Sequence, residues 1–304
     1  MNTSTEPLFP HEREVRHIPA QRPFRLTRST LFEGNALTVL QALPNESVQC
    51  VITSPPYWGL RDYGIDNQIG LEPSLAQFLN RLTFVFAEVR RVLKPDGTLW
   101  LNIGDSYTSG NRGYRATDKK NPARAMNVRP PTPDGLKPKD LIGVPWRLAF
   151  ALQDDGWFLR SDVVWNKPNA MPESVQDRPI RSHEYLFMLT KSERYYYDRS
   201  AVREPADQGG LRHRRTVWNV NTKPFAGAHF ATFPPELIRP CVLASSRPGD
   251  FILDPFFGSG TVGLVAQEEN RQYVGIELNP EYVNMAADRL HGLHSNIFQI
   301  AANG

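Results

Sequence analysis

The segment from Phe251 to Thr261, which reads FILDPFFGSGT, restricts the fold of this chain more than any other. It has the form of a short apolar strand ending in an acid, then a glycine-rich turn, then the start of a helical pattern. This order is typical of an open α/β sheet in which a helix N-terminus binds a nucleotide-like ligand. Gly258, Gly260 and Gly263 match G-x-G-x-x-G, a weak signal for a dinucleotide site, and no lysine follows them to make a P-loop.

The next apolar segment, Tyr273 to Glu277, has the form of a second strand that also ends in an acid. In nucleotide-binding α/β folds, a carboxylate at this place binds the ribose hydroxyls. The two segments together predict a cofactor that carries a nucleoside.

A stiff aromatic corner, Ser54-Pro55-Pro56-Tyr57, follows directly on the apolar run from Val48 to Thr53. The two prolines contribute carbonyl acceptors and no N–H donors, so the corner offers one hydroxyl, backbone acceptors and one aromatic face. A flat ring that carries an amino group fits such a pocket. An ordinary strand end followed by a loop is the other interpretation of this tetrapeptide.

Strand and helix patterns alternate along the chain, which predicts an α/β fold with a doubly wound, mostly parallel sheet. Strands are expected at 48–53, 98–103, 157–165, 184–190, 251–254 and 273–277, and helices at 75–94, 145–154, 235–245, 261–269 and 280–290. A turn is expected at Pro95-Asp96-Gly97. No long helix separates 157–165 from 184–190, so these two strands are expected to form an antiparallel hairpin at one edge of the sheet.

The composition is that of a cytoplasmic protein without a membrane segment. The chain has 304 residues, of which 40% are hydrophobic, enough to bury a full α/β core. Its two cysteines, Cys50 and Cys241, do not form a C-x-x-C pair, so neither a structural metal nor a disulfide framework is expected. The N-terminus has no apolar core of signal-peptide length, and no run approaches the length of a membrane span.

Three motifs carry a family resemblance. TSPPYW, DPFFGSGT and YVGIELNPEYV, in that order, resemble the catalytic, cofactor-loop and ribose-binding motifs of the beta-type (permuted) S-adenosylmethionine-dependent DNA amino-methyltransferases. The resemblance covers roughly residues 31 to 290. It implies a Rossmann-like methyltransferase domain at 31–304 after an N-terminal extension at 1–30. Ser54 resembles the N4-cytosine branch, since the N6-adenine branch more usually has Asp or Asn at that position.

The resemblance implies that the corner formed by Ser54, Pro55, Pro56 and Tyr57 holds a target base flipped out of the duplex. The Ser54 hydroxyl and the Pro55 carbonyl would accept hydrogen bonds from the exocyclic amine, and Tyr57 would stack on the base. Trp58 is either a second wall of this pocket or a core residue.

The resemblance also implies a set of residues that bind S-adenosylmethionine. The glycine loop would donate backbone N–H groups to the methionine carboxylate, Asp254 would lie near the ammonium group, and Glu277 would bind the ribose. Asn35 stands where related sequences often have Asp, so either a contact with adenine or a turn or cap role is open. The full set is Asn35, Phe233, Pro234, Asp254, Pro255, Phe256, Gly258, Ser259, Gly260, Thr261, Glu277 and Asn279.

Positive charge is concentrated in two inserted segments. Residues 108–140 carry eight Lys or Arg against three acids, and residues 199–225 carry six against two, although the whole chain has a net charge of only +3. Such segments suit the phosphate backbone of double-stranded DNA, or they are solvated loops. The resemblance favours 199–228 as the target-recognition region, with 108–140 as the competing candidate. The candidate DNA-binding residues are Arg112, Arg115, Lys119, Lys120, Arg212, Arg214 and Arg215.

Three alternatives remain at this stage. N6-adenine methylation differs only in the residue at the Ser54 position, and a dinucleotide-dependent oxidoreductase would use the glycines without the Ser-Pro-Pro-Tyr corner. A non-catalytic DNA-binding module would need neither the glycine turn nor Glu277. The recognition sequence, a cognate restriction endonuclease of a restriction-modification system and a homodimer are not determined by the sequence.

Overall fold

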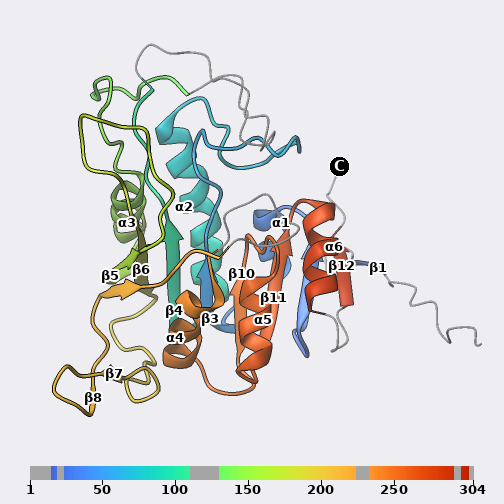
Figure 1. Cartoon of the computed structure of the whole chain (residues 1–304). Helices are drawn as coiled ribbons and strands as arrows, with labels where there is room; N and C mark the ends of the chain where they lie inside the picture. Colours follow the sequence, from blue (N-terminus) through green and yellow to red (C-terminus); the bar gives the residue numbers. More distant parts are fainter. Residues whose placement is uncertain (1–14, 19–23, 110–129, 224–232, 291–295, 301–304) are drawn as a thin grey trace, which may run out of the picture.

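The computed structural model describes residues 15–18, 24–109, 130–223, 233–290 and 296–300. A ten-stranded sheet runs through them in the order β1-β12-β2-β11-β10-β3-β4-β6-β5-β9. All neighbouring strands are parallel except the pairs that β6 makes with β4 and β5 (Figure 1). The predicted α/β fold with a mostly parallel sheet and an antiparallel hairpin is therefore confirmed.

The bounds of the elements follow the sequence patterns closely. The sheet strands are β1 (Val15–Ile18), β2 (Thr30–Glu33), β3 (Val48–Thr53), β4 (Leu93–Ile103), β5 (Phe158–Asn166), β6 (His183–Thr190), β9 (Val217–Asn219), β10 (Phe251–Asp254), β11 (Gln272–Glu277) and β12 (Asn296–Ile300). The helices are α1 (Ala36–Ala42), α2 (Leu75–Val92), α3 (Val144–Asp154), α4 (Pro235–Ser245), α5 (Thr261–Glu268) and α6 (Pro280–Arg289). A separate two-stranded ribbon pairs β7 (Glu204–Pro205) with β8 (Leu211–Arg212).

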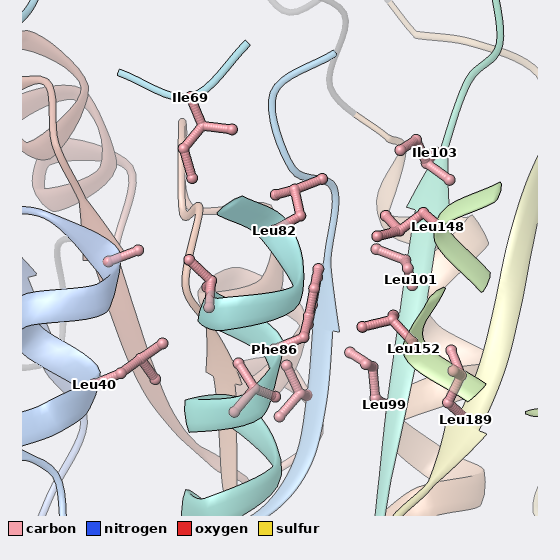
Figure 2. Packing of buried hydrophobic residues seen from close by; sticks show 14 of the residues in the cluster. Leu40, Ile69, Leu82, Phe86, Leu99, Leu101, Ile103, Leu148, Leu152 and Leu189 are labelled. Carbon is pink, nitrogen blue, oxygen red and sulfur yellow. The ribbon is translucent and has the colours of Figure 1, made fainter. Parts of the chain in front are cut away.

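Two hydrophobic cores lie on opposite faces of the sheet, because the side chains of a strand alternate between its faces. One core contains α1, α2 and α3, with Leu99 and Leu101 of β4 among the strand residues (Figure 2). The other contains α4, α5 and α6, with Trp100 of β4 among the strand residues. In the described part of the chain, helices on both faces make the doubly wound arrangement and bury the central strands on both sides.

Several details differ from the sequence expectations. The turn expected at Pro95-Asp96-Gly97 lies inside the 11-residue strand β4, where the pairing with β3 shifts register between Val48 and Cys50. The proline and glycine thus produce an irregular strand, since the residues on both sides pair with β3. The hairpin of β5 and β6 is next to the edge, with the short β9 outside it. β1 lies within the expected N-terminal extension and pairs with β12 of the same sheet.

The chain places its predicted site at one end of the sheet. Ser54, Pro255 and Leu278 follow the carboxyl ends of β3, β10 and β11, which are parallel neighbours. Ligands of open α/β sheets bind at this end of the strands. Because β6 is antiparallel to β4, its first residues also lie at this carboxyl edge. No helix in the described part of the chain has the length and apolar character that a membrane crossing requires.

Candidate active site

The two principal motifs are joined by one buried hydrogen bond. The Thr53 hydroxyl, at the end of β3, donates to Asp254 Oδ1, at the end of β10, over 2.6 Å. Asp254 is only 2% exposed, and the same oxygen accepts the backbone N–H of Phe256 at 3.0 Å. The bond fixes the Ser-Pro-Pro-Tyr corner against the start of the glycine loop.

Burial raises the pKa of Asp254 to about 7, although the hydrogen bonds from Thr53 and Phe256 lower it. Within the described residues, the charge that acts on this carboxyl is Glu277, which raises the pKa further. A buried carboxyl in this state is stabilised in its ionised form by a positive charge brought close to it. The ammonium group of a bound ligand would supply that charge.

The glycine loop adopts the geometry that its sequence requires. Gly258 and Gly260 have φ values of 51° and 79°, in the left-handed region that favours glycine, and Gly260 is the N-cap of α5. Around Gly258 the space is open, since a Cβ there would meet only the Phe256 carbonyl, at 4.0 Å. A ligand can therefore approach the backbone of this loop closely.

Gly263 and Gly275 serve packing and not ligand binding. A Cβ on Gly263 would lie 2.7 Å from the ring of Phe257, and one on Gly275 would lie 2.6 Å from the same ring. Phe257 fills the space between α5 and β11, so the third glycine of the G-x-G-x-x-G match allows close packing of helix and strand.

Glu277 holds the glycine loop from the neighbouring strand. Its two carboxylate oxygens accept the backbone N–H groups of Gly258 and Asn279, each at 2.8 Å. Burial raises the pKa of Glu277, and these N–H donors lower it. Each oxygen keeps a further lone pair, so the carboxylate can accept from a ribose hydroxyl while it fixes the loop.

The other residues expected around the cofactor fall into two groups. Asn35 and Asn279 are helix N-caps: Asn35 accepts from the backbone N–H groups of Leu37 and Thr38, and Asn279 accepts from Glu281. Asn35 thus caps α1, and its contact with the cofactor adenine stays a prediction. Phe233 and Pro234 are buried before α4, Pro255, Phe256 and Ser259 belong to the loop after β10, and Thr261 is the first residue of α5.

Arg289 of α6 is a residue of this region that the motifs did not indicate. Its guanidinium donates to the Ser259 carbonyl at 3.1 Å, to the Ser259 hydroxyl at 3.2 Å and to the Thr261 hydroxyl at 2.9 Å. Burial lowers the pKa of Arg289. This arginine therefore fixes the two hydroxyls on either side of Gly260.

The acceptor corner has a fixed tyrosine. The Tyr57 hydroxyl donates to Glu184 Oε2 at 2.9 Å, and a Cβ on Gly104 would lie 2.7 Å from the Tyr57 ring. Burial raises the pKa of Tyr57 well above its usual range, while a hydrogen bond with the Ser54 hydroxyl lowers it. Trp58 is a core residue, 5% exposed, whose indole N–H donates to the Glu72 carbonyl at 2.9 Å.

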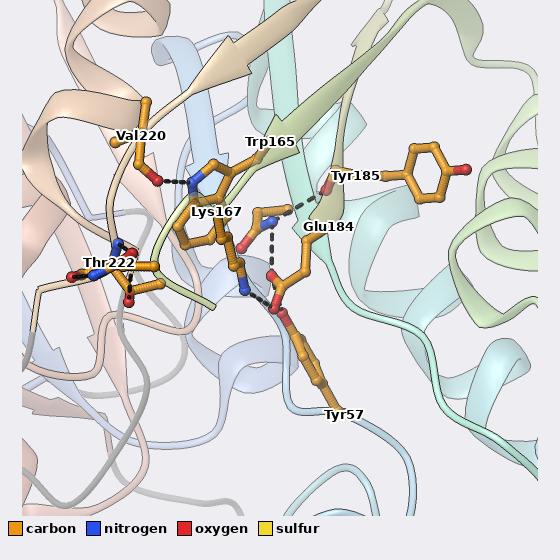
Figure 3. Close-up of polar contacts among 9 residues, drawn as sticks. Tyr57, Trp165, Lys167, Glu184, Tyr185, Val220 and Thr222 are labelled. Carbon is orange, nitrogen blue, oxygen red and sulfur yellow. Dashed lines mark hydrogen bonds and ion pairs between the residues drawn. The ribbon is translucent and has the colours of Figure 1, made fainter. Parts of the chain in front are cut away.

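A polar cluster behind Tyr57 was missed by the motif analysis (Figure 3). Its centre is Glu184, the second residue of β6, which forms an ion pair with Lys167 at the end of β5. Asn102 of β4 donates to Glu184 Oε2 at 3.2 Å and to the Tyr185 carbonyl at 3.1 Å. These residues come from three strands, and in the sequence each lies inside an unremarkable strand pattern or just after one.

The two basic segments differ in their relation to the site. Arg112, Arg115, Lys119 and Lys120 lie outside the described residues. Arg212 is held in ion pairs with Glu204 and Asp207, at 2.9 and 2.8 Å. The Arg214 guanidinium lies 4.4 Å from the centre of the Trp218 ring, and the Arg215 carbonyl accepts the indole N–H of Trp218 at 2.6 Å.

The structure does not bring Arg212, Arg214 and Arg215 together with Ser54. They precede β9, which is parallel to β5 and therefore runs in the same direction as β3. β9 pairs with Val164 to Asn166, the last residues of β5, so Arg214 and Arg215, which directly precede β9, are not at the amino end of the sheet. Arg212 lies in the β7–β8 ribbon, which projects from the opposite end of the molecule (Figure 1).

Comparisons with known proteins agree with this geometry. The family model described as DNA methylase, of the N6 and N4 methyltransferases, matches residues 48–288. The chain is 76% identical over 288 residues to the type II methyltransferase M.XycI of Xanthomonas campestris pv. cyanopsidis, covering 95% of this chain and 96% of that protein. It is 74% identical over 288 residues to the type II methyltransferase M.Cfr9I of Citrobacter freundii, with the same coverage.

Solved structures share the fold. The PvuII DNA methyltransferase (cytosine-N4-specific) superposes with a TM-score of 0.66 at 23% identity, covering 93% of this chain and 92% of that chain. TTHA0409 of Thermus thermophilus, solved in complex with S-adenosyl-L-methionine, gives a TM-score of 0.62 at 24% identity, covering 90% of this chain and 100% of that chain. With its matching motifs, sheet and relatives, the chain belongs to the N6/N4 DNA methylase family.

Proposed function

We propose that this DNA methyltransferase transfers the methyl group of S-adenosylmethionine to the N4 amine of a cytosine in double-stranded DNA. The observation that carries the choice of cytosine is Ser54, a neutral hydroxyl in the corner where the N6-adenine branch more usually has Asp or Asn. The structural match to the cytosine-N4-specific PvuII enzyme supports the fold of this chain and does not decide which base it methylates.

The residues around the glycine loop fit S-adenosylmethionine. The sulfonium group supplies an electrophilic methyl group when the cofactor is bound. Asp254 offers a buried carboxyl without a positive neighbour in the described chain, which suits the methionine ammonium. The open space beside Gly258 lets the cofactor approach the loop, and Glu277, which accepts the Gly258 N–H, keeps lone pairs for the ribose hydroxyls.

The corner residues prepare the acceptor amine. The lone pair of an exocyclic amine is conjugated into its ring, which makes the nitrogen a weak nucleophile. Hydrogen bonds from the amine to the Ser54 hydroxyl and to the Pro55 carbonyl favour a pyramidal nitrogen whose lone pair points at the methyl group. The base reaches the corner by leaving the duplex, at a cost of a few kcal/mol of unstacking.

We place the DNA on the carboxyl edge of the sheet, where two connections form one surface next to the corner. Lys139, from the segment before α3, forms an ion pair with Asp177, from the connection between β5 and β6, at 2.6 Å. Arg178 of the same connection lies 3.8 Å from the centre of the Tyr107 ring. This placement moves target recognition from 199–228 to the competing segment 108–140. A cognate restriction endonuclease and a homodimer stay predictions.

The experiment uses the purified chain, S-adenosylmethionine with a labelled methyl group and unmethylated genomic DNA, followed by digestion to nucleosides. We expect N4-methylcytosine to carry the label. Ser54→Ala is the matched control, which should keep the cofactor affinity and lose most of the transfer. Label in N6-methyladenine alone would reassign the enzyme to the adenine branch, and the absence of any labelled nucleoside would overturn the proposed activity.

A further inference from the structure

Arg178 is held in a fixed position on the surface where we place the DNA. It belongs to the connection between β5 and β6, and its guanidinium carbon lies 3.8 Å from the centre of the Tyr107 ring. Nη1 of the guanidinium donates to Glu173 Oε2 at 2.7 Å and to the Pro179 carbonyl at 3.1 Å. The ring therefore covers one face of the guanidinium, and two acceptors hold one of its edges.

The segments that carry these groups are themselves fixed. Tyr107 pairs with Leu141 in an antiparallel bridge, and the N–H of the next residue, Thr108, donates to the Asp140 carbonyl at 2.9 Å. A proline directly follows Arg178 and restricts its backbone to extended conformations. The orientation of the guanidinium is therefore set before any ligand binds.

The opposite edge of the Arg178 guanidinium is open. Within the described residues, Nη1 makes the hydrogen bonds of this side chain, and Nε and Nη2 donate to no protein group. The N–H bonds of Nε and Nη2 form a rigid fork that binds two neighbouring acceptors at once. O6 and N7 of guanine present such a pair of acceptors in the major groove, and so do two oxygens of a phosphate.

Charge decides between guanine and phosphate. Glu173 lies 2.7 Å from the Arg178 guanidinium, so its negative charge offsets the positive charge and repels a phosphate. This pair is partly buried, with side chains 24% and 34% exposed. Lys139 and Asp177 form a far more exposed pair, at 78% and 59%, which water screens, so that the ammonium is free to leave it for a phosphate. Guanine O6 and N7 carry no net charge, so Arg178 donates to them without the repulsion.

The surroundings of Arg178 place it close to the target base. Its stacking partner, Tyr107, lies three residues after Gly104. A Cβ on Gly104 would lie 2.7 Å from the ring of Tyr57 in the acceptor corner. Three residues span about 10 Å at most, and the base pairs of a duplex stack about 3.4 Å apart. Arg178 is therefore within a few base pairs of a base bound in the corner.

We propose that Arg178 recognises a guanine in the major groove near the methylated base, with Nε and Nη2 donating to its O6 and N7. Glu173 fixes the orientation of the fork, and the Tyr107 ring supports its face. The inference rests on the proposed methylation of a flipped base in double-stranded DNA. Stacking alone does not single out this residue, because Arg247 lies 3.8 Å from the Tyr196 ring shortly before β10, at the other edge of the sheet. The clamped edge and the open fork do.

The test measures the binding of duplex DNA by fluorescence anisotropy, with S-adenosylhomocysteine as the bound cofactor. The specific duplex contains the sequence that the wild type methylates or, if it transfers no methyl group, the sequence that it enriches from a random pool. Arg178→Lys keeps the charge and loses the fork. We expect its affinity for the specific duplex to fall roughly 5- to 150-fold, while its affinity for random duplex and its salt dependence equal those of the wild type.

A guanine analogue tests the contact directly. 7-Deazaguanine lacks the N7 acceptor but keeps the shape of guanine and its pairing with cytosine. Placed at each guanine of the specific sequence in turn, it should weaken wild-type binding at a position where Arg178→Lys is insensitive to it. Arg247→Lys is the matched control, stacked at the same distance, and should keep the wild-type affinity and pattern. The cofactor affinity of each variant, measured by calorimetry, should equal that of the wild type and shows that the variant is folded.

Glu173→Gln separates the two candidate ligands by the sign of its effect. If Arg178 recognises guanine, loss of the charged clamp should weaken binding to the specific duplex and not to random duplex. If Arg178 contacts a phosphate, removal of the neighbouring negative charge should strengthen binding to both duplexes alike.

The phosphate result in Glu173→Gln would overturn the inference. So would an unchanged affinity in Arg178→Lys, an equal loss on both duplexes, or a wild type that is insensitive to 7-deazaguanine at every position. These are binding measurements, so they are distinct from the failure of the proposed function, in which the DNA treated with the wild type contains no labelled N4-methylcytosine.

Discussion

Asp254 should make the binding of S-adenosylmethionine depend on pH in a range where an ordinary aspartate would not. Its pKa is raised from 3.8 to about 7 by burial, so below pH 7 the free protein holds a neutral carboxyl there. The cofactor ammonium is stabilised by the ionised form. Binding below pH 7 must therefore release a proton, and the affinity should fall about tenfold for each pH unit, or about 1.4 kcal/mol.

The perturbation is Asp254→Asn, which retains an oxygen for the Thr53 hydroxyl and the Phe256 N–H but has no proton to release. We expect the wild-type affinity to fall about tenfold between pH 7 and pH 6, and the variant to bind weakly with little change over the same interval. The range stays below the pKa of the cofactor amine, about 7.7–8.0 for an α-amino group.

The raised pKa of Asp254 also changes how the free energy of unfolding depends on pH. The direction is opposite to that for a salt-bridged aspartate, whose pKa is lowered. Because the folded-state pKa lies above the unfolded one, the free protein should lose stability as the pH rises from about 4 to about 7. The pKa shift corresponds to a loss of about 4 kcal/mol at most in the free energy of unfolding. Glu277, whose pKa is also raised, acts in the same direction, so the difference between wild type and Asp254→Asn isolates Asp254.

Isothermal titration calorimetry in two buffers of different ionisation enthalpy measures both the affinity and the number of protons released. Urea unfolding at several pH values measures how the free energy of unfolding depends on pH. Asp250→Asn is the control and should keep the wild-type pH dependence. A wild-type affinity that is constant from about pH 5.5 to about pH 7.5, or an equal slope in Asp254→Asn, would refute the assignment of Asp254 to the cofactor ammonium.

Two further predictions test the packing of the glycine loop and the placement of DNA. Gly275→Ala puts a Cβ 2.6 Å from the Phe257 ring, so the free energy of unfolding in urea should fall by about 1–3 kcal/mol; an unchanged free energy of unfolding would contradict the packing role. Arg212→Ala should leave the salt dependence of DNA binding by fluorescence anisotropy unchanged, because Arg212 lies in the β7–β8 ribbon away from the site (Figure 1). Lys139→Ala, on the surface proposed for DNA, should flatten that dependence; the reverse pattern would return recognition to 199–228.

Much of the fold was predictable because its signals are local. The apolar run from Val48 to Thr53 is β3, and the strand, turn and helix of Phe251 to Thr261 form as expected, since hydrophobic periodicity and glycine conformation act within a few residues. The short strand β2 and the helix α1 were not predicted, because four and seven residues give little periodicity and, unlike the four-residue β10, they belong to none of the recognised motifs. β3 and β10 both end at residues of the site, and their parallel pairing brings Ser54 near Asp254.

The sequence by itself determined the two half-sites: a corner that presents a hydroxyl and an aromatic ring, and a glycine loop followed by an acid. Only the tertiary structure decided what surrounds them. Glu184, Lys167 and Asn102 meet because β4, β5 and β6 are neighbours in the sheet, and Arg212 is remote from Ser54 because it lies in the separate β7–β8 ribbon (Figure 1). Contacts of this kind depend on strand order and direction, which the hydrophobic pattern of a single strand does not encode.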